Sequence, residues 1–325
     1  MKTIAPPQLV SCRAFHSDEP GRAPALFATM VFCALFASGV NAAILGAHVK
    51  GGTPGGMPFD FTQSTSTAPS AGVTGSSVGT LGAGEVLASA LAEAQVGVLR
   101  VQSMTSGRAG ASASGQFAAE GGASWVDSLT LDAAGRTGQL GTLSAAISVG
   151  GTLTVDFSGR AYSLAGVGAS IDLFPGVGFN GGRTIISNGS TIDYGYQAPF
   201  RRQNNPSDEF ILSFTVPFMY GRPIGLTAVL NTNAFSRLNS PDGESLASSV
   251  YSSTLYWQGI SSVLDKDGNS VTDFTAVSSG GYDLSKAFVV PVPPALGLLA
   301  GALGTLAYAS DRRRRQCAGT ARSSA

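Results

Sequence analysis

Apolar and polar residues alternate in short runs through most of the chain between residues 96 and 289. From residue 123 onward, Trp125, Leu129 and Leu131 alternate with polar residues as far as a turn-forming segment at residues 132–135. A period of two places the apolar side chains on one face of a β-strand. Comparable runs lie at residues 96–103, 140–149, 151–157, 161–171, 183–186, 191–196, 210–217, 226–231, 250–258, 271–276 and 287–289.

The spacing of these runs predicts an all-β domain. Clusters of Gly, Asn, Asp and Pro separate them, and almost no stretch is long enough for the helices that connect parallel strands. The 43 glycines suit a fold with many tight turns. The clearest hairpin spans residues 255–274, with its turn at Asp267 and Gly268. We therefore expect residues 85–289 to form an antiparallel, jelly-roll-like β-sandwich.

The region before residue 96 follows a different pattern. Residues 84–95 carry apolar side chains at helical spacing, which predicts a helix of about three turns. Residues 43–84 are rich in Gly, Ser, Thr and Pro, and we expect a loosely ordered N-terminal arm there. A pair of edge strands around Phe59 and Val73 is the alternative.

The N-terminal segment resembles a secretory signal peptide. Residues 23–42 are apolar and uncharged, and Lys2, Arg13 and Arg22 precede them. Small residues at the end of this stretch are what a signal peptidase accepts. We expect residues 1–42 to form a signal helix that is cleaved after Ala42 or after Ala43. A retained membrane anchor is the alternative.

The C-terminal segment has three parts: a proline-rich stretch, an apolar stretch and a basic cluster. Residues 295–310 are 16 residues without a charge. As a helix they would be about 24 Å long, which nearly spans a hydrocarbon core of about 30 Å. Basic residues after a membrane helix stay in the cytoplasm, so everything upstream would lie on the far side of the membrane. The basic cluster is Arg312, Arg313, Arg314 and Arg315, and residues 316–325 are expected to be a disordered tail.

Together these parts resemble the C-terminal sorting signal of the PEP-CTERM family, in its VPLPA-like variants. The resemblance implies that an exosortase, an intramembrane cysteine transpeptidase, recognises residues 290–315 and cleaves near the proline motif. The released protein would then reach the cell envelope or the extracellular matrix of a Gram-negative bacterium. The proline motif is Val290, Pro291, Val292 and Pro293.

The part of the chain between leader and tail is mildly acidic. It holds 12 Lys and Arg against 17 Asp and Glu, a net charge of about −5, within a 325-residue chain that is neutral overall. Phosphate contacts need clustered Lys and Arg, so this balance argues against a nucleic-acid partner. Cys12 and Cys33 lie in the leader and Cys317 lies beyond the arginines. The exported part therefore has no cysteine and depends on a hydrophobic core for its stability.

Few residues in this part are suited to catalysis. His48 is its single histidine, and we expect it to be solvent-exposed on the arm rather than part of a Ser-His-Asp triad. No HExxH or phosphate-loop motif occurs here. The sequence therefore predicts a protein that is not an enzyme, with no catalytic residue and no cofactor.

The predicted hairpin turn has some features of a cation site. Asp265, Asp267 and Asn269 alternate around a glycine, as the first ligands of calcium loops do. A complete EF-hand loop has a bidentate Glu at its twelfth position, where this chain has Ala276. The residues are thus interpreted as a turn, with a calcium site as the alternative.

Aromatic residues provide a hypothesis about binding. Tyr256 and Trp257 are suited to a flat platform that stacks on sugar rings, although sandwich cores bury aromatic residues too. Two functions follow as hypotheses. The first is a non-catalytic envelope or matrix protein associated with exopolysaccharide or biofilm, whose partners are signal peptidase, exosortase and the membrane. The second is a carbohydrate-binding module, assisted by calcium at the turn.

Overall fold

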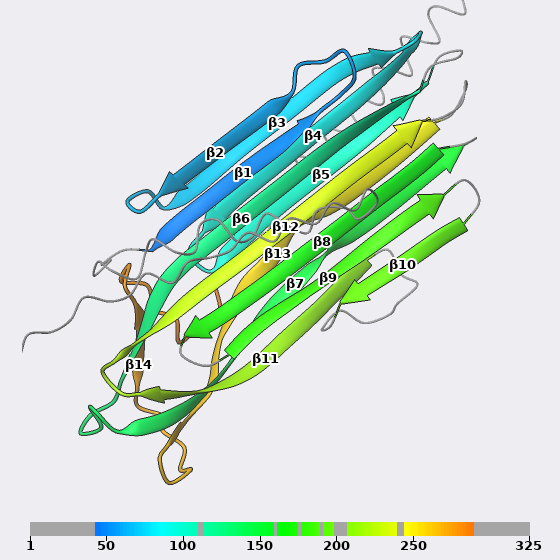
Figure 1. Ribbon diagram of the computed structural model, residues 1–325. Coiled ribbons are helices and arrows are strands. Elements are labelled where there is room, and N and C mark those ends of the chain that lie inside the picture. The colour runs from blue at the N-terminus through cyan, green and yellow to red at the C-terminus, as the bar shows by residue number, and fades with distance from the viewer. Residues whose placement is uncertain are drawn as a thin grey trace, which may run out of the picture. The chain divides into compact units, whose positions relative to one another are not determined.

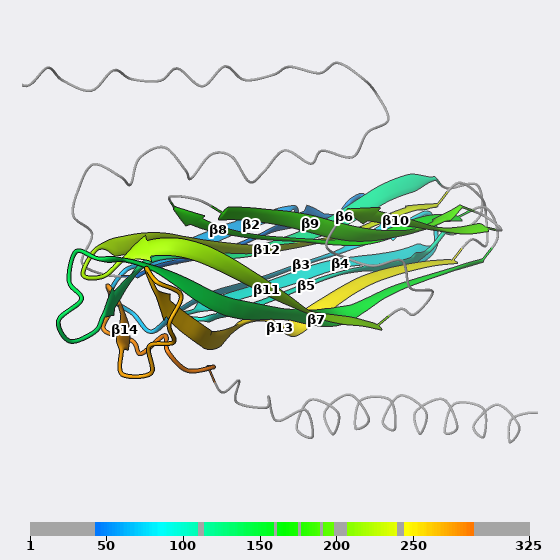
Figure 2. The ribbon, with the colours of Figure 1, turned by 90° about the horizontal axis from the view of Figure 1, so that it is seen from below.

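The computed structural model describes residues 43–109, 114–158, 161–174, 177–188, 191–197, 207–238 and 244–288. Their regular structure consists of β-strands in two antiparallel sheets that lie face to face (Figure 1, Figure 2). The all-β class predicted from the sequence is confirmed, and two facing antiparallel sheets are the arrangement of a β-sandwich. Within the described residues, no helix is long and apolar enough to span a membrane.

The described strands follow one another in the chain with short connections. In order they are β1 (Ile44–Gly52), β2 (Phe59–Thr65), β3 (Ser70–Leu81), β4 (Gly84–Gln95), β5 (Val98–Arg108), β6 (Gly115–Asp132), β7 (Leu140–Ser158), β8 (Ala161–Phe174), β9 (Val177–Asn188), β10 (Thr191–Gln197), β11 (Ser207–Met219), β12 (Pro223–Leu238), β13 (Glu244–Asp265) and β14 (Thr275–Ser278).

The strands divide between an eight-stranded and a six-stranded sheet. Sheet A has the order β10-β9-β8-β12-β6-β1-β2, and β14 also pairs with β6. Sheet B has the order β11-β7-β13-β5-β4-β3. Two consecutive strands occupy equivalent places, because β12 lies between β8 and β6 while β13 lies between β7 and β5. The centre of each sheet is therefore completed only when these late strands have been inserted.

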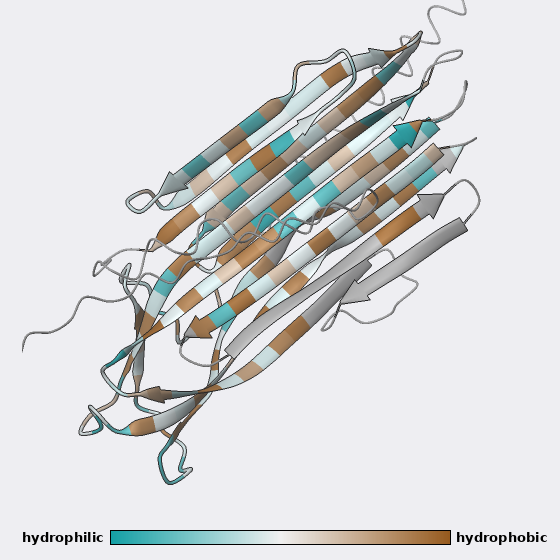
Figure 3. Cartoon of the chain, in the orientation of Figure 1, coloured by the Kyte–Doolittle hydropathy of each residue, from teal (hydrophilic) through white to brown (hydrophobic). Residues whose placement is uncertain are grey.

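Alternation along each strand places the core between the sheets. In β12, Leu226 and Leu230 are buried, whereas Asn231 and Asn233 lie on the outer face of sheet A. Figure 3 shows this alternation as apolar and polar bands that follow one another along the strands. The hydrophobic effect favours the arrangement because each strand removes one row of apolar side chains from water.

Residues 84–95 form the strand β4, so the helix predicted there is wrong. The buried positions recur every second residue, at Ala88, Ala90, Ala92 and Ala94. Alanine favours helices in isolation, yet β3 and β5 pair along both sides of β4 and satisfy its backbone groups. Tertiary pairing thus overrides the local preference.

The loosely ordered arm predicted for residues 43–84 is also wrong, and the alternative of edge strands is confirmed. β2 begins at Phe59 and is one edge of sheet A, while β3 contains Val73 and is one edge of sheet B. Phe59 packs between the sheets, where a Cβ added to Gly51 or Gly75 would lie 2.5 Å or 2.2 Å from its ring. The sandwich therefore begins at Ile44 rather than at residue 85.

Glycine occurs inside the strands as well as in turns. β7 runs through Gly150 and Gly151, where the sequence predicted a break between two strands. Gly121 in β6 shows why glycine is suitable there, since a Cβ would lie 3.0 Å from the carbonyl oxygen of Leu91 in the facing sheet. A residue without a side chain lets the two sheets approach at this point. The number of glycines therefore predicts more turns than the structure has, because some of them lie inside strands.

The turn of the predicted hairpin is confirmed, but its second strand differs. Asp265 N donates to Asn269 O at 2.9 Å, and Gly268 has a φ of +82°, which favours glycine. The returning chain meets β13 at the Leu264–Ser270 bridge and then forms β14, which pairs with β6. The second half of the hairpin is thus used to extend sheet A.

The last described residues are hydrogen-bonded to β13. Trp257 Nε1 donates to Leu284 O at 2.8 Å, and Phe288 N donates to Trp257 O at 3.1 Å. The Phe288 ring covers Gly97, where an added Cβ would lie 2.3 Å from it. This C-terminal strap, residues 279–288, carries no strand over residues 287–288, where the sequence predicted one.

Candidate functional site

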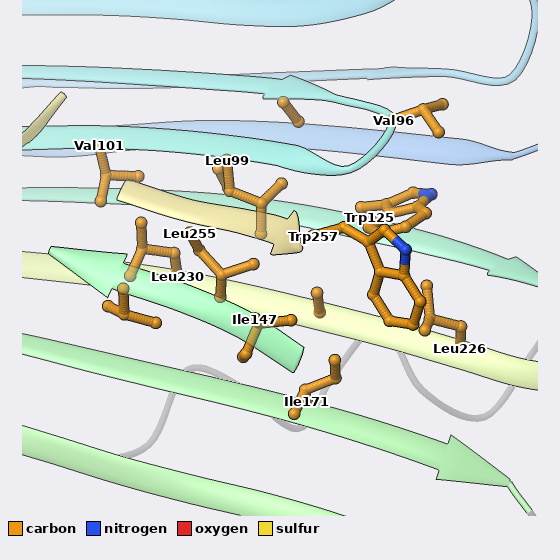
Figure 4. Close-up of a cluster of buried hydrophobic side chains, with 14 of the residues drawn as sticks. Val96, Leu99, Val101, Trp125, Ile147, Ile171, Leu226, Leu230, Leu255 and Trp257 are labelled. Carbon is orange, nitrogen blue, oxygen red and sulfur yellow. The ribbon is translucent and has the colours of Figure 1, made fainter. Parts of the chain in front are cut away.

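Trp257, predicted as half of a sugar-stacking platform, lies in the core. Its relative exposure is 0%, and its ring centroid is 6.5 Å from that of Trp125 and 6.0 Å from that of Phe214. Figure 4 shows the two indoles among buried apolar side chains. An enclosed ring cannot stack on an external sugar, so the predicted platform is wrong. Tyr256 is half-buried and alternates with Trp257 along β13, which leaves it without that partner.

The predicted calcium ligands form a closed turn instead. Asp265 Oδ1 accepts hydrogen bonds from Asn269 N at 2.9 Å and Asp267 N at 3.0 Å. Its Oδ2 accepts from Arg136 Nη1 at 2.9 Å. Asp267 pairs with Lys266 at 2.6 Å. The carboxylate oxygens that a calcium ion would need are therefore engaged by donors, and no cluster of three potential metal ligands occurs in the described part of the chain.

The same contacts determine the ionisation of this turn. The backbone hydrogen bond from Asn269 and the Arg136 guanidinium favour the charged carboxylate and lower the pKa of Asp265 to about 2. Arg136 lies in the β6–β7 connection, so its bond to Asp265 joins two loops at one end of the sandwich. The turn therefore serves to hold the structure together.

His48 lies in β1 and not on an arm, so its predicted exposure is wrong. Its ring is half-buried. The side chains of His48 and Asn231 both cover Gly122, where an added Cβ would lie 2.1 Å from His48 Cε1 and 2.6 Å from Asn231 Oδ1. Burial lowers the pKa of His48, while the nearby Glu120 and Asp60 raise it by a smaller amount. The histidine is thus largely neutral at pH 7, on the outer face of sheet A.

The outer face of sheet B carries a groove that could hold a ligand. It has a volume of about 520 Å³, in the range of small-ligand sites, and lies over the paired residues Gly75 and Ala90. Residues of β3, β4 and β5 line it from this face, and Phe61 of β2 lines it from the edge of the neighbouring sheet. The lining side chains are those of Phe61, Thr74, Ser76, Ser89, Leu91 and Gln102.

Sequence reasoning missed this groove because it placed most of its residues in an arm and a helix. Phe61 is 50% exposed, although the equivalent residue two positions earlier, Phe59, is buried. An alternating pair of phenylalanines between polar residues was the available signal. It indicates a strand, but not that only one of the two rings would be exposed, since this depends on how β2 lies against the facing edge strand β3.

The predicted processing sites lie at or beyond the limits of the described residues. Ala43 is the first described residue and is buried, one position before β1 begins. Ala42, the proline motif and the arginine cluster lie outside the described residues. The signal helix, the membrane helix of residues 295–310 and the tail of residues 316–325 lie outside them as well.

Comparison with known proteins does not assign the site. No protein-family model, curated protein or solved structure matches this chain. The interpretation of the groove and of the termini therefore rests on the residues themselves.

Proposed function

We propose that the protein is an exported, non-catalytic component of the cell envelope or of an exopolysaccharide matrix or biofilm. Signal peptidase would remove residues 1–42, and a C-terminal helix would hold the precursor in the membrane until exosortase cleaves the PEP-CTERM-like signal. The observation that carries the proposal is the order of the parts. A proline motif, an uncharged apolar stretch and four arginines follow the cysteine-free β-sandwich, whose last described residue, Phe288, is two positions before the proline motif.

The short distance between body and signal supports the proposal. Residues 289–294 separate Phe288 from the apolar segment, and three of them are proline. In the extended polyproline II conformation a chain rises about 3.1 Å per residue, so six residues could extend over at most roughly 20 Å. In that conformation the segment would offer its backbone to a membrane-embedded peptidase. The bulk of the sandwich would stay outside the lipid.

The strand order supports a jelly roll as the specific kind of sandwich. Sheet B contains β5-β13-β7-β11 and sheet A contains β6-β12-β8-β9. These eight strands, with the late pair β12 and β13 inserted between earlier ones, follow the double Greek key of a jelly roll. β1 to β4, β10 and β14 are then additions to this framework. A fold of this kind serves many functions, so the topology by itself assigns none.

A comparison of two strains tests the proposed export. The full chain is produced in a strain with an exosortase and in the same strain lacking it, and the membranes are separated from the medium. We expect the protein in the medium only when the exosortase is present. Retention in the membrane in both strains would replace the proposal with a plain single-pass anchor.

Substitution of the arginine cluster sharpens this test. Changing Arg312, Arg313, Arg314 and Arg315 together to Ser removes the charges that hold the C-terminus in the cytoplasm, and we expect disturbed topology and retention. Changing the same four residues to Lys keeps the charge and is the matched control for topology. Equal behaviour of the two variants and the parent would show that the cluster has no role.

A carbohydrate-binding module is the second candidate function, and the groove on sheet B is the observation that favours it. Its half-exposed phenylalanine and polar lining are suited to a sugar. The calcium-assisted form of this hypothesis is disfavoured, because the donors around Asp265 occupy its carboxylate.

A further inference from the structure

We propose that the groove lined by Phe61 binds a segment of neutral polysaccharide. The inference rests on the matrix role proposed above and assigns the class of partner and the residues that would contact it. It replaces the predicted platform at Tyr256 and Trp257 with a site formed by β2, β3, β4 and β5.

Phe61 supplies the apolar surface that such a ligand needs. Half of the residue is exposed, and it lies at the β3 edge of the groove. The C–H face of a sugar ring is apolar, so it packs against an aromatic ring and removes apolar surface of both partners from water. Leu91 adds a second apolar side chain on the groove's lining.

The polar lining is free to bind sugar hydroxyls. Thr74, Ser76 and Ser89 contribute hydroxyl groups and Gln102 contributes an amide, and each of these can both donate and accept. Their side chains make no hydrogen bond to another residue within the described part of the chain. All four stand on paired strands, so the backbone that positions them is already ordered before a ligand binds.

The charges around the groove favour a neutral ligand. None of its lining residues is charged. The next residues along the same face, Glu93 and Arg100, are paired with each other at 3.0 Å. A carboxylated or sulfated polymer would find no unpaired cation among these residues. The site therefore differs from those that recognise anionic sugars through Arg and Lys.

Affinity electrophoresis tests the proposal on the full chain. The protein is run in native gels containing hydroxyethyl cellulose, dextran, galactomannan or alginate, in a polyoxyethylene detergent that carries no sugar headgroup. We expect at least one of the three neutral polymers to retard the protein and alginate to have no effect. Retardation by alginate alone, or by none of the four polymers, would overturn the proposal.

Three single substitutions locate the binding. Phe61→Ala should weaken it about tenfold, and Gln102→Ala by a smaller factor. Val78→Ala is the matched control, because Val78 is 57% exposed on β3 but does not line the groove, and its affinity should equal that of the parent. Unchanged retardation of Phe61→Ala would place the binding elsewhere and contradict the proposal. If Phe61→Ala instead abolishes a concentration-dependent dimer in sedimentation, the groove is a contact between copies and the sugar assignment is wrong.

This assay is independent of sorting. It measures binding of polysaccharide to the groove whether or not the C-terminal signal has been cleaved. A chain that is sorted but not retarded would refute the glycan site alone, and a chain that is retarded but not sorted would refute the export route alone.

Discussion

The interior of the sandwich has an aromatic end and a hydroxyl end, and the two are stabilised differently. Towards the end that carries β14, Trp125, Trp257 and Phe214 pack together, with centroid distances of 6.0–6.5 Å. Towards the opposite end of β12, Ser236 bonds to Thr105 at 2.9 Å and to Ser245 at 2.6 Å.

The comparison shows how one core combines strength with a defined alignment of its sheets. Burial of aromatic rings contributes a large free energy that depends little on direction. Thr105 and Ser245 belong to sheet B and Ser236 to sheet A, so the hydroxyl chain joins the sheets through bonds that require a particular register. A shifted register would leave buried hydroxyls without partners, which costs free energy.

The largest effect is expected at the aromatic end. Trp257→Ala should lower the free energy of unfolding by about 3–5 kcal/mol, because it removes a fully buried indole and leaves a cavity. It also removes the hydrogen bond to Leu284 O that holds the C-terminal strap. Urea denaturation measures the change. A loss no greater than that of the exposed control Val78→Ala would contradict this picture of the core.

A smaller effect is expected at the hydroxyl end. Ser236→Ala should cost about 1–3 kcal/mol, since it leaves the hydroxyls of Thr105 and Ser245 without this partner inside the core. A double-mutant cycle with Ser245→Ala separates the bond from the packing, and we expect the two changes to be non-additive. Additive losses would show that the hydroxyls act independently and do not form a network.

The salt bridge at the aromatic end should make stability depend on pH. The pKa of Asp265 is about 2 in the folded protein, below the usual value of about 3.9, so its contribution is present above pH 4 and is lost as the pH falls towards 2. Asp265→Asn should therefore be less stable than the parent at pH 6. The difference should shrink at pH 2.5. Chemical denaturation at the two pH values measures it, and a difference that does not change with pH would exclude the proposed ionisation.

The smallest effect on stability is expected at the groove. Phe61→Ala should change the free energy of unfolding by no more than about 0.5 kcal/mol, because half of the residue already faces water. Phe59→Ala is the contrasting variant, since Phe59 is 5% exposed and should cost about 3 kcal/mol or more. Similar losses for both would mean that Phe61 is part of the core and not a binding surface.

The sequence predicted the fold class but not the extent of the strands. Alternation around Trp125 and Leu129 is a local property, and it identified β6 correctly. β4 was misread because its inward residues are alanines, whose helix preference is overcome by pairing with β3 and β5. These partners are the strands just before and after it, so residues 84–95 by themselves do not reveal the pairing.

The candidate site was harder to predict than the fold. Trp257 and Phe61 are both aromatic residues on strands. The residues around each of them in the sequence do not show which ring is buried. That outcome depends on strand order, because β13 lies in the middle of sheet B while β2 is the edge of sheet A. The Asp265 turn is the opposite case. Its aspartate and glycine indicated a turn directly, whereas the salt bridge to Arg136 comes from a loop 129 residues away.

The intact mass of the protein tests the central claim most directly. The full chain is isolated from the strain that contains an exosortase and from the strain that lacks it, and both proteins are weighed by mass spectrometry. The account predicts that only the first strain yields a chain that ends near Val290, Pro291, Val292 and Pro293 and lacks the arginine cluster. If the same C-terminal residues, including Arg312 to Arg315, are present in the protein from both strains, the β-sandwich is not released by cleavage and the proposed function is wrong.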